Sequence, residues 1–331
     1  MAKVVHVQSK AGTTVWIGTE VNTGTATASG GAWLQLPVTD YSFTELNQQT
    51  LDSAPFRVGQ GVGMGQSDAM VKPKRHDRMH EISLTMHASA AALNRLGLHL
   101  FEDNGQPLVL TGALPAINRF KHGGGTPSGI VPVTILFDTA SHSDTDLWFM
   151  SCMCTNMTIS GSIDGDGGSL MLSCTFITGY KPIEGSLTAD ASDAAVSDQV
   201  PVSNIHSFST TTLGGSGGDL VLHSFELSIA RSAQRHGWQA SSFDPYAQAV
   251  GGFEVTGSLS CKRDGNSLAA TAEGSTLALS LTDGTFAITC PAVYVDSPAI
   301  DFADNGWLQT IPFRAVHTGA ATNAIVTIDT A

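Results

Sequence analysis

The chain has 331 residues, a length that favours two domains over one. Charged residues make up only 14 % and glycine occurs 35 times, a composition typical of short strands joined by many turns. The net charge of −13 excludes a protein that grips nucleic acid through a basic surface, because an acidic surface repels phosphates.

The N-terminal third begins with long irregular segments. Residues 1–35 contain a stretch rich in Gly, Thr, Ser and Ala between Trp16 and Trp33, and we interpret them as an N-terminal arm. Residues 36–45 predict the first strand. Residues 46–78 form a long segment, which is uncommon in a compact domain unless it serves a purpose. Two interpretations stay open, a disordered excursion or an inter-subunit loop, and the second would use a basic cluster: Lys72, Lys74, Arg75 and Arg78.

A strand and a helix are predicted next. Residues 81–87 (EISLTMH) alternate apolar and polar side chains, which is the period of a strand with one buried face. Residues 89–100 (SAAALNRLGLHL) carry an apolar stripe at helical spacing, and Ser89 is the expected N-cap. Residues 107–114 and 130–137 predict two further strands.

The stretch at 148–180 is predicted to form a hairpin that occurs twice in the chain. It consists of an apolar strand, a turn rich in Gly and Asp, and a returning strand that alternates. Residues 286–319 repeat this order and align Cys152 with Cys290, Asp166 with Asp304, Leu170 with Leu308 and, after a one-residue slip, Phe176 with Phe313. The repeat predicts a mainly all-β protein with two related β-sandwich domains, of which at least one has a flanking α-helix.

The domain boundaries follow from composition. Residues 181–204 are poor in aromatic residues and rich in Ala, Ser and Asp, so we interpret them as a linker between a first domain, 36–180, and a second domain, 205–331. A short helical segment is expected between Asp244 and Ala249. Strands of the second domain are predicted by alternation over three stretches: 220–231, 252–262 and 277–282.

No set of residues indicates catalysis, a cofactor or a metal, so the chain is predicted not to be an enzyme. Cys152, Cys154 and Cys174 would converge on the hairpin, but a fourth zinc ligand is missing, and buried cysteines more often serve as small apolar residues. The Asp-Gly run at 164–168 lacks the later acidic ligand of a calcium loop, which favours a plain hairpin turn. A surface or interface role is favoured for three histidines that are not spaced along one helical face: His76, His80 and His87.

Cysteine count and hydropathy bear on the compartment. Five cysteines are an odd and low number for a disulfide scaffold, which favours folding in a reducing cytoplasm. No apolar run reaches the length of a membrane span, and the first residues lack the apolar core of a signal peptide.

The alternating strands predict sheets that are apolar on one face and polar on the other. Such sheets have edges that a protein must cover, charge or close by joining other strands. Candidate functional residues are the hydroxyl- and carboxylate-bearing side chains on the polar faces: Glu81, Ser83 and Thr85 in the first domain, and Glu226, Ser228, Glu254, Thr256, Ser258 and Ser260 in the second.

Several stretches together carry a family resemblance. They are Trp16–Glu20 (WIGTE), Leu36–Phe43 (LPVTDYSF), the long segment after it, the strand and helix at 81–100, and the duplicated hairpin. In these features the chain resembles the major tail tube proteins of long-tailed, siphophage-like bacteriophages, in the tandem form with two tube domains.

The resemblance implies a structural virion protein. Sheets of neighbouring subunits would join into a barrel, and stacked rings, trimeric and pseudo-hexameric, would form a channel for DNA delivery. The polar-face residues named above would face the lumen, where DNA passes without specific binding, and residues 46–78 would contact another subunit. Implied partners are copies of the chain, the tape measure protein, the tail terminator and the distal tail protein.

The resemblance also implies a place in the virion tail after assembly in the host cytoplasm, with no membrane contact. The alternative hypothesis is a two-domain β-sandwich binding module, such as an adhesin or a carbohydrate-binding protein. Such a module would need an exposed aromatic platform, and the five tryptophans are scattered along the sequence.

Overall fold

The prediction of a mainly all-β protein is confirmed. The computed structural model describes residues 12–27, 33–43, 50–52, 74–76, 79–100, 108–111, 118–121, 123, 132–139, 146–186, 200–208, 210–214, 220–239, 244–262, 274, 276–303, 306–319 and 323–330. These residues form antiparallel strands and one α-helix, α1 (Ala90–Leu100). None of their helices has the length and apolar character that a membrane crossing requires.

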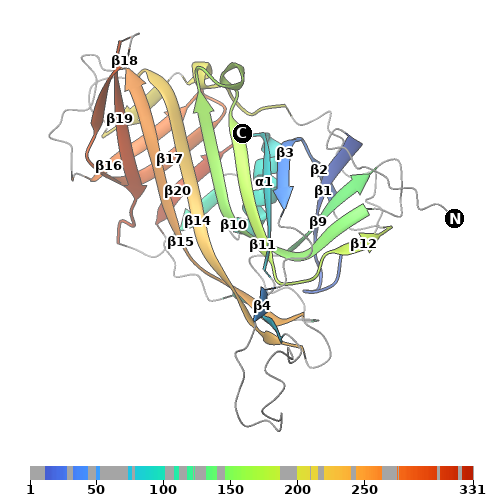
Figure 1. Ribbon diagram of the computed structural model, residues 1–331. Coiled ribbons are helices and arrows are strands. Elements are labelled where there is room, and N and C mark those ends of the chain that lie inside the picture. The colour runs from blue at the N-terminus through green and yellow to red at the C-terminus, as the bar shows by residue number, and fades with distance from the viewer. Residues whose placement is uncertain are drawn as a thin grey trace, which may run out of the picture.

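Eight strands from both halves of the chain form one continuous antiparallel sheet, here called the long sheet (Figure 1). Its order is β3 (Val38–Phe43), β6 (His80–His87), β11 (Met171–Thr178), β10 (Asp146–Ser162), β14 (Leu222–Trp238), β15 (Pro245–Lys262), β19 (Gly306–Ala315) and β18 (Ala299–Ala303). The pairing of β10 with β14 joins the two halves of the chain.

The remaining strands pack on the apolar side of this sheet or extend it. A second sheet contains β2 (Trp33–Leu36), β1 (Thr13–Thr19), β9 (Val133–Thr139), the first residues of β10, and β12 (Ile183–Gly185). A third group contains β13 (Thr210–Leu213), β16 (Thr276–Thr282), β17 (Ala287–Val295), β20 (Ala324–Asp329) and β7 (Leu108–Thr111). The far part of β15 pairs with β8 (Asn118–Lys121), while β4 (Thr50–Asp52) and β5 (Lys74–His76) form a separate pair.

The predicted helix is confirmed with its cap. The hydroxyl of Ser89 accepts a hydrogen bond from the backbone N–H of Ala92 at 3.2 Å, which satisfies a donor that the first turn would leave unpaired. The apolar stripe is buried, with Ala92, Leu93, Leu96 and Leu100 in the main core. That core is one cluster with members from both halves of the chain.

Two sequence expectations differ from the structure. Residues 244–249, expected to include a short helix, lie at the start of β15, apart from Asp244, which precedes it, because the long pairing with β14 overrides a weak local helical preference. Within residues 1–35, the described part includes β1 and part of β2, and Val15 and Ile17 of β1 are buried in the main core.

Gly257 marks a close approach between strands in the long sheet. It lies between Leu227 of β14 and Phe313 of β19 on the apolar side. A Cβ at this position would lie 2.4 Å from the carbonyl oxygen of Glu226 and 2.4 Å from Cζ of Phe313. Glycine is therefore required for close packing rather than for backbone freedom.

We expect Gly257→Ala to lower the free energy of unfolding by roughly 1–3 kcal/mol, because the added methyl group forces the backbone or the Phe313 ring to move. Urea denaturation of the purified protein measures the change. Gly252→Ala on the same strand is the matched control, since no heavy atom lies within 4 Å of the position that an added Cβ would take there. Equal stability of the two variants would contradict the close-approach argument.

Candidate functional site

The polar side of the long sheet carries the candidate residues of both halves on one surface, here called the polar face. In a single row across the sheet, Thr85 lies opposite Ser173, Ser173 opposite Thr158, Thr158 opposite Ser228, and Ser228 opposite Thr256. A neighbouring row places Ser160 opposite Glu226 and Glu226 opposite Ser258. Strand alternation produces this arrangement, because residues two apart share a face.

Side-chain hydrogen bonds cross the junction between the two halves. The hydroxyl of Thr158 donates to Oγ of Ser228 at 3.3 Å, and Oγ of Ser228 donates to Oδ1 of Asn156 at 3.0 Å. Cross-strand pairs of this kind stabilise a sheet and fix its register. The polar face is therefore continuous over the β10–β14 junction.

The structure brings all nine sequence-predicted residues onto strands of the polar face. None of them is buried, and Glu81, Glu226 and Glu254 are exposed. Glu81 lies at the border of this surface, because Ile177 opposite it belongs to a small apolar cluster with Met153 and Val250.

Some residues of the polar face were missed by the sequence analysis. Asn156, Thr158 and Ser160 of β10 alternate with buried residues, a signal that was present in the sequence but was attributed only to hairpin formation. The exposed cation of Arg314 was also missed. Its Nη2 lies 3.1 Å from Oε1 of Glu254, so the positive charge is paired on the surface, while Lys262 lies exposed at the end of β15.

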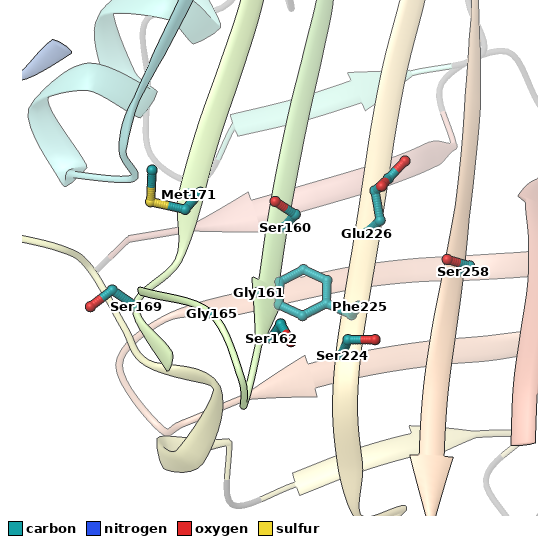
Figure 2. Close-up of a pocket in the computed structure, with 10 residues that line it drawn as sticks. All are labelled: Ser160, Gly161, Ser162, Gly165, Ser169, Met171, Ser224, Phe225, Glu226 and Ser258. Atoms are coloured by element: carbon teal, nitrogen blue, oxygen red, sulfur yellow. The ribbon is translucent and has the colours of Figure 1, made fainter. Parts of the chain in front are cut away.

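A hollow of about 340 Å³ opens on the polar face beside the β10–β11 turn. Figure 2 shows the side chains around it, which include Ser160 and Ser162 on β10, Ser224 and Glu226 on β14, and Ser258 on β15. Serine hydroxyl groups and the carboxylate of Glu226 line this depression together with the apolar side chains of Met171 and Phe225. The polar groups of this lining can form hydrogen bonds with water, and its described residues include no lysine or arginine that could bind a phosphate.

A buried carboxylate holds β10 where this strand passes from the second sheet to the long sheet. Oε1 of Glu20 accepts hydrogen bonds from the backbone N–H of Ser151 at 2.6 Å and from the hydroxyl of Thr134 at 2.9 Å. Oε2 accepts one from the hydroxyl of Ser151 at 2.7 Å. Ser151 has a φ of 48°, a left-handed conformation that a non-glycine residue adopts only with such support.

Burial dominates the chemistry of Glu20. It raises the pKa of this carboxyl group from 4.5 to about 7, against the hydrogen bonds that lower it. The negative charge in turn adds to the effect of burial in raising the pKa of the Cys152 thiol and of the Tyr180 hydroxyl. Gln248 of β15 completes the site by donating to the carbonyl oxygen of Ser151 at 2.9 Å and accepting from the N–H of Gly179 at 2.9 Å.

The three hairpin cysteines are buried and free of disulfides. Burial, followed by a hydrogen bond with Cys154, raises the pKa of the Cys174 thiol well above its ordinary value. Within the part of the chain that the structure describes, no group of three or more His, Cys, Asp or Glu residues could hold a metal ion. The three buried thiols act here as small apolar side chains.

The predicted inter-subunit loop is described only in part. Lys74 and Arg75 lie on β5, which pairs with β4. Lys72 and Arg78 lie outside the described residues. His76 also lies on β5, His80 is buried beside the ring of Phe149, and His87 ends β6 half-buried.

A family model described as phage tail tube protein matches residues 10–315 of the 331. No curated protein matches the chain. The matched range includes every residue of the polar face named above.

Proposed function

Because the chain belongs to the phage tail tube protein family, we propose that it is the major tail tube subunit, whose stacked rings form a channel for DNA delivery. Membership alone makes the chain a structural component of the virion tail that assembles with itself and with other tail proteins. It does not favour the alternative of an adhesin or carbohydrate-binding module.

The strand order of the long sheet is the observation that carries the ring proposal. The first half contributes β3–β6–β11–β10 and the second half β14–β15–β19–β18. Both halves arrange their four strands in the same way: the two strands that come first in the sequence are followed in the sheet by the fourth strand and then by the third. Because β10 joins β14 inside the chain, the same kind of junction between β18 and the next copy's β3 would extend the sheet from copy to copy.

The repeat also gives a stagger that suits a closed barrel. The sequence repeat aligns Phe176 with Phe313. In the sheet, the residues directly opposite one another lead from Phe313 on β19 through β15, β14 and β10 to Leu172 on β11. Leu172 lies four residues before Phe176, the residue that the sequence repeat aligns with Phe313. A shift of four residues over four strands corresponds to a strand tilt of about 35° at about 3.3 Å per residue and about 4.8 Å per strand.

Three copies would then close a ring of pseudo-sixfold symmetry. At this tilt their strands give a circumference of about 140 Å and a backbone diameter of about 45 Å. We propose that the polar face looks inward and that its serine, threonine and glutamate side chains let DNA slide, since phosphates find few cations there. The lumen-facing residues are proposed to be the nine candidates together with their row partners on β10 and β11.

The remaining assignments are part of the same proposal. The tube domains are residues 36–180 and 205–331, with 1–35 as an N-terminal segment whose strand β1 packs on the first domain and 181–204 as the linker. Residues 46–78 are proposed to reach a neighbouring subunit through Lys72, Lys74, Arg75 and Arg78. The tape measure, tail terminator and distal tail proteins are the proposed tail partners, and assembly takes place in the host cytoplasm.

Charge reversal on the polar face tests the channel. We expect phage that carry Glu81→Lys together with Glu226→Lys to assemble normal tails but to eject DNA about tenfold more slowly or worse, because lysines in the lumen bind passing phosphates. Electron microscopy scores tails, and plating efficiency scores delivery. Normal plating would contradict the lumen assignment.

The matched control separates position from charge. Glu226→Lys alone is compared with Glu184→Lys, which changes an exposed glutamate on β12, away from the polar face. We expect only the Glu226 variant to slow DNA delivery. Monomers without rings or tubes from the unaltered protein would contradict the proposed function itself.

A further inference from the structure

The two end strands of the long sheet have one free edge each within the described residues. There β3 pairs only with β6, and β18 pairs only with β19. Apolar side chains on these edges are incompletely covered, since Ile300 of β18 is 40 % exposed and Tyr41 and Phe43 of β3 are only half-buried. An open edge with apolar side chains beside it is a template for another strand.

The repeat identifies what each edge residue corresponds to in the other half. Leu172 lies four residues before Phe176, and Gln309 lies four residues before Phe313, so Leu172 and Gln309 are equivalent positions of the repeat. Leu172 is opposite Ile159 on β10, and Gln309 is opposite Ile300 on β18. Ile300 therefore corresponds to Ile159, although the structure buries Ile159 completely.

The opposite edge is matched in the same way. Phe176 is opposite Ile82, which is opposite Phe43 on β3. Phe313 is opposite Gly257, which is opposite Leu227 on β14. Phe43 therefore corresponds to Leu227, a residue that is only 2 % exposed.

Inside the chain, Ile159 lies directly opposite Leu227 at the junction of the two halves. We infer that β18 of one copy pairs antiparallel with β3 of the next in the register that places Ile300 opposite Phe43. The inference rests on the proposed ring and adds to it the two strands, their register and the residues that meet. The occupant of each edge is a second copy of this chain.

The junction between copies then reproduces the junction within one copy. On the apolar side, Ile300 and Phe43 become buried as Ile159 and Leu227 already are, which removes exposed apolar surface at both edges. In the same register Asp301 of one copy pairs with Ser42 of the next, as Ser160 pairs with Glu226 within one copy. The polar face thereby continues from one copy into the next.

Disulfide trapping tests the register. Opposite residues of antiparallel strands have Cα atoms about 4.5–5.5 Å apart, within the range that a disulfide spans. The native cysteines are all buried. We expect Ser42→Cys with Asp301→Cys to form covalent multimers under mild oxidation of assembled protein. Ser42→Cys with Ala299→Cys, two residues out of register and about 6.6 Å further along the strand, should stay monomeric on a denaturing gel.

A second pair of variants tests the apolar contact without cysteines. We expect Ile300→Asp to stay folded by circular dichroism but to lose ring formation, because a carboxylate would have to be buried against Phe43. Ile163→Asp is the matched control. Ile163 is 37 % exposed in the β10–β11 turn, away from both edges, and its variant should form rings.

The outcomes separate the register from the proposed function. Rings that cross-link only through the out-of-register pair, or that form normally with Ile300→Asp, overturn the inference and leave the ring intact. Unaltered protein that forms no rings under microscopy overturns both. Selective trapping of the Ser42–Asp301 pair together with loss of rings in Ile300→Asp supports the inference.

Discussion

Replacing Glu20 with glutamine is expected to abolish a fall of about 3 kcal/mol in the free energy of unfolding between pH 4.5 and pH 8. Burial raises the pKa of Glu20 to about 7 in the folded protein, whereas the unfolded chain has the ordinary value of 4.5. Below pH 4.5 both states hold the proton. Between the two values only the folded state holds it, so each rise of one pH unit removes about 1.4 kcal/mol of stability.

Glutamine keeps the shape of the side chain and has no charge to bury. Its carbonyl oxygen can accept from the N–H of Ser151 and its amide can donate to the Ser151 hydroxyl, so the fold is retained. Urea denaturation at several pH values measures the difference between wild type and variant. Glu184→Gln, at an exposed position, is the control for removing one charge, with an expected change within about 0.5 kcal/mol. A wild-type slope that persists in Glu20→Gln would contradict the assignment.

Replacing Arg231 with methionine is expected to destabilise the protein by about 3 kcal/mol or more. Arg231 is buried on β14 and donates from Nη1 to the carbonyl oxygen of Leu100, the last residue of α1, at 3.1 Å. Its Nε and Nη2 donate to the carbonyl oxygen of Gly251 at 3.3 Å and 3.2 Å. Methionine fills much of the space but leaves buried carbonyl oxygens without these donors.

The same substitution at an exposed arginine gives the comparison. Arg314→Met removes a surface ion pair with Glu254, and such pairs contribute about 0–1 kcal/mol. Thermal or urea unfolding of both variants measures the difference. Equal losses would show that the Arg231 hydrogen bonds to the helix end and to β15 add little.

The polar face was accessible to sequence analysis because its cause is local. Alternation along β6, β14 and β15 decides which side chains share a face, and each strand shows this in its own residues. The cap at Ser89 was predictable for the same reason. Strand partners are a different matter, since nothing within β10 or β14 alone selects the pairing of Ile159 with Leu227.

The buried carboxylate shows a second limit. Glu20 stands in the WIGTE stretch, where a charged residue is normally expected at the surface. Its burial depends on Thr134 and Ser151, which are distant in sequence and whose backbone and hydroxyl groups meet it only after β1, β9 and β10 have assembled. The one sequence signal for the burial of Glu20 is that it is a single charged residue in a stretch of otherwise apolar or small residues.

The covalent link between the two halves changes how polymerisation depends on concentration. In the proposed trimeric ring, every second junction between halves is the β10–β14 junction within one chain, so it closes at an effective concentration set by the fold and persists at any dilution. Only the junctions between separate chains depend on the concentration of subunits. A tandem subunit in such a ring should therefore nucleate through fewer collisions than a single-domain homologue that builds the same circumference, and its nucleation rate should depend less steeply on subunit concentration.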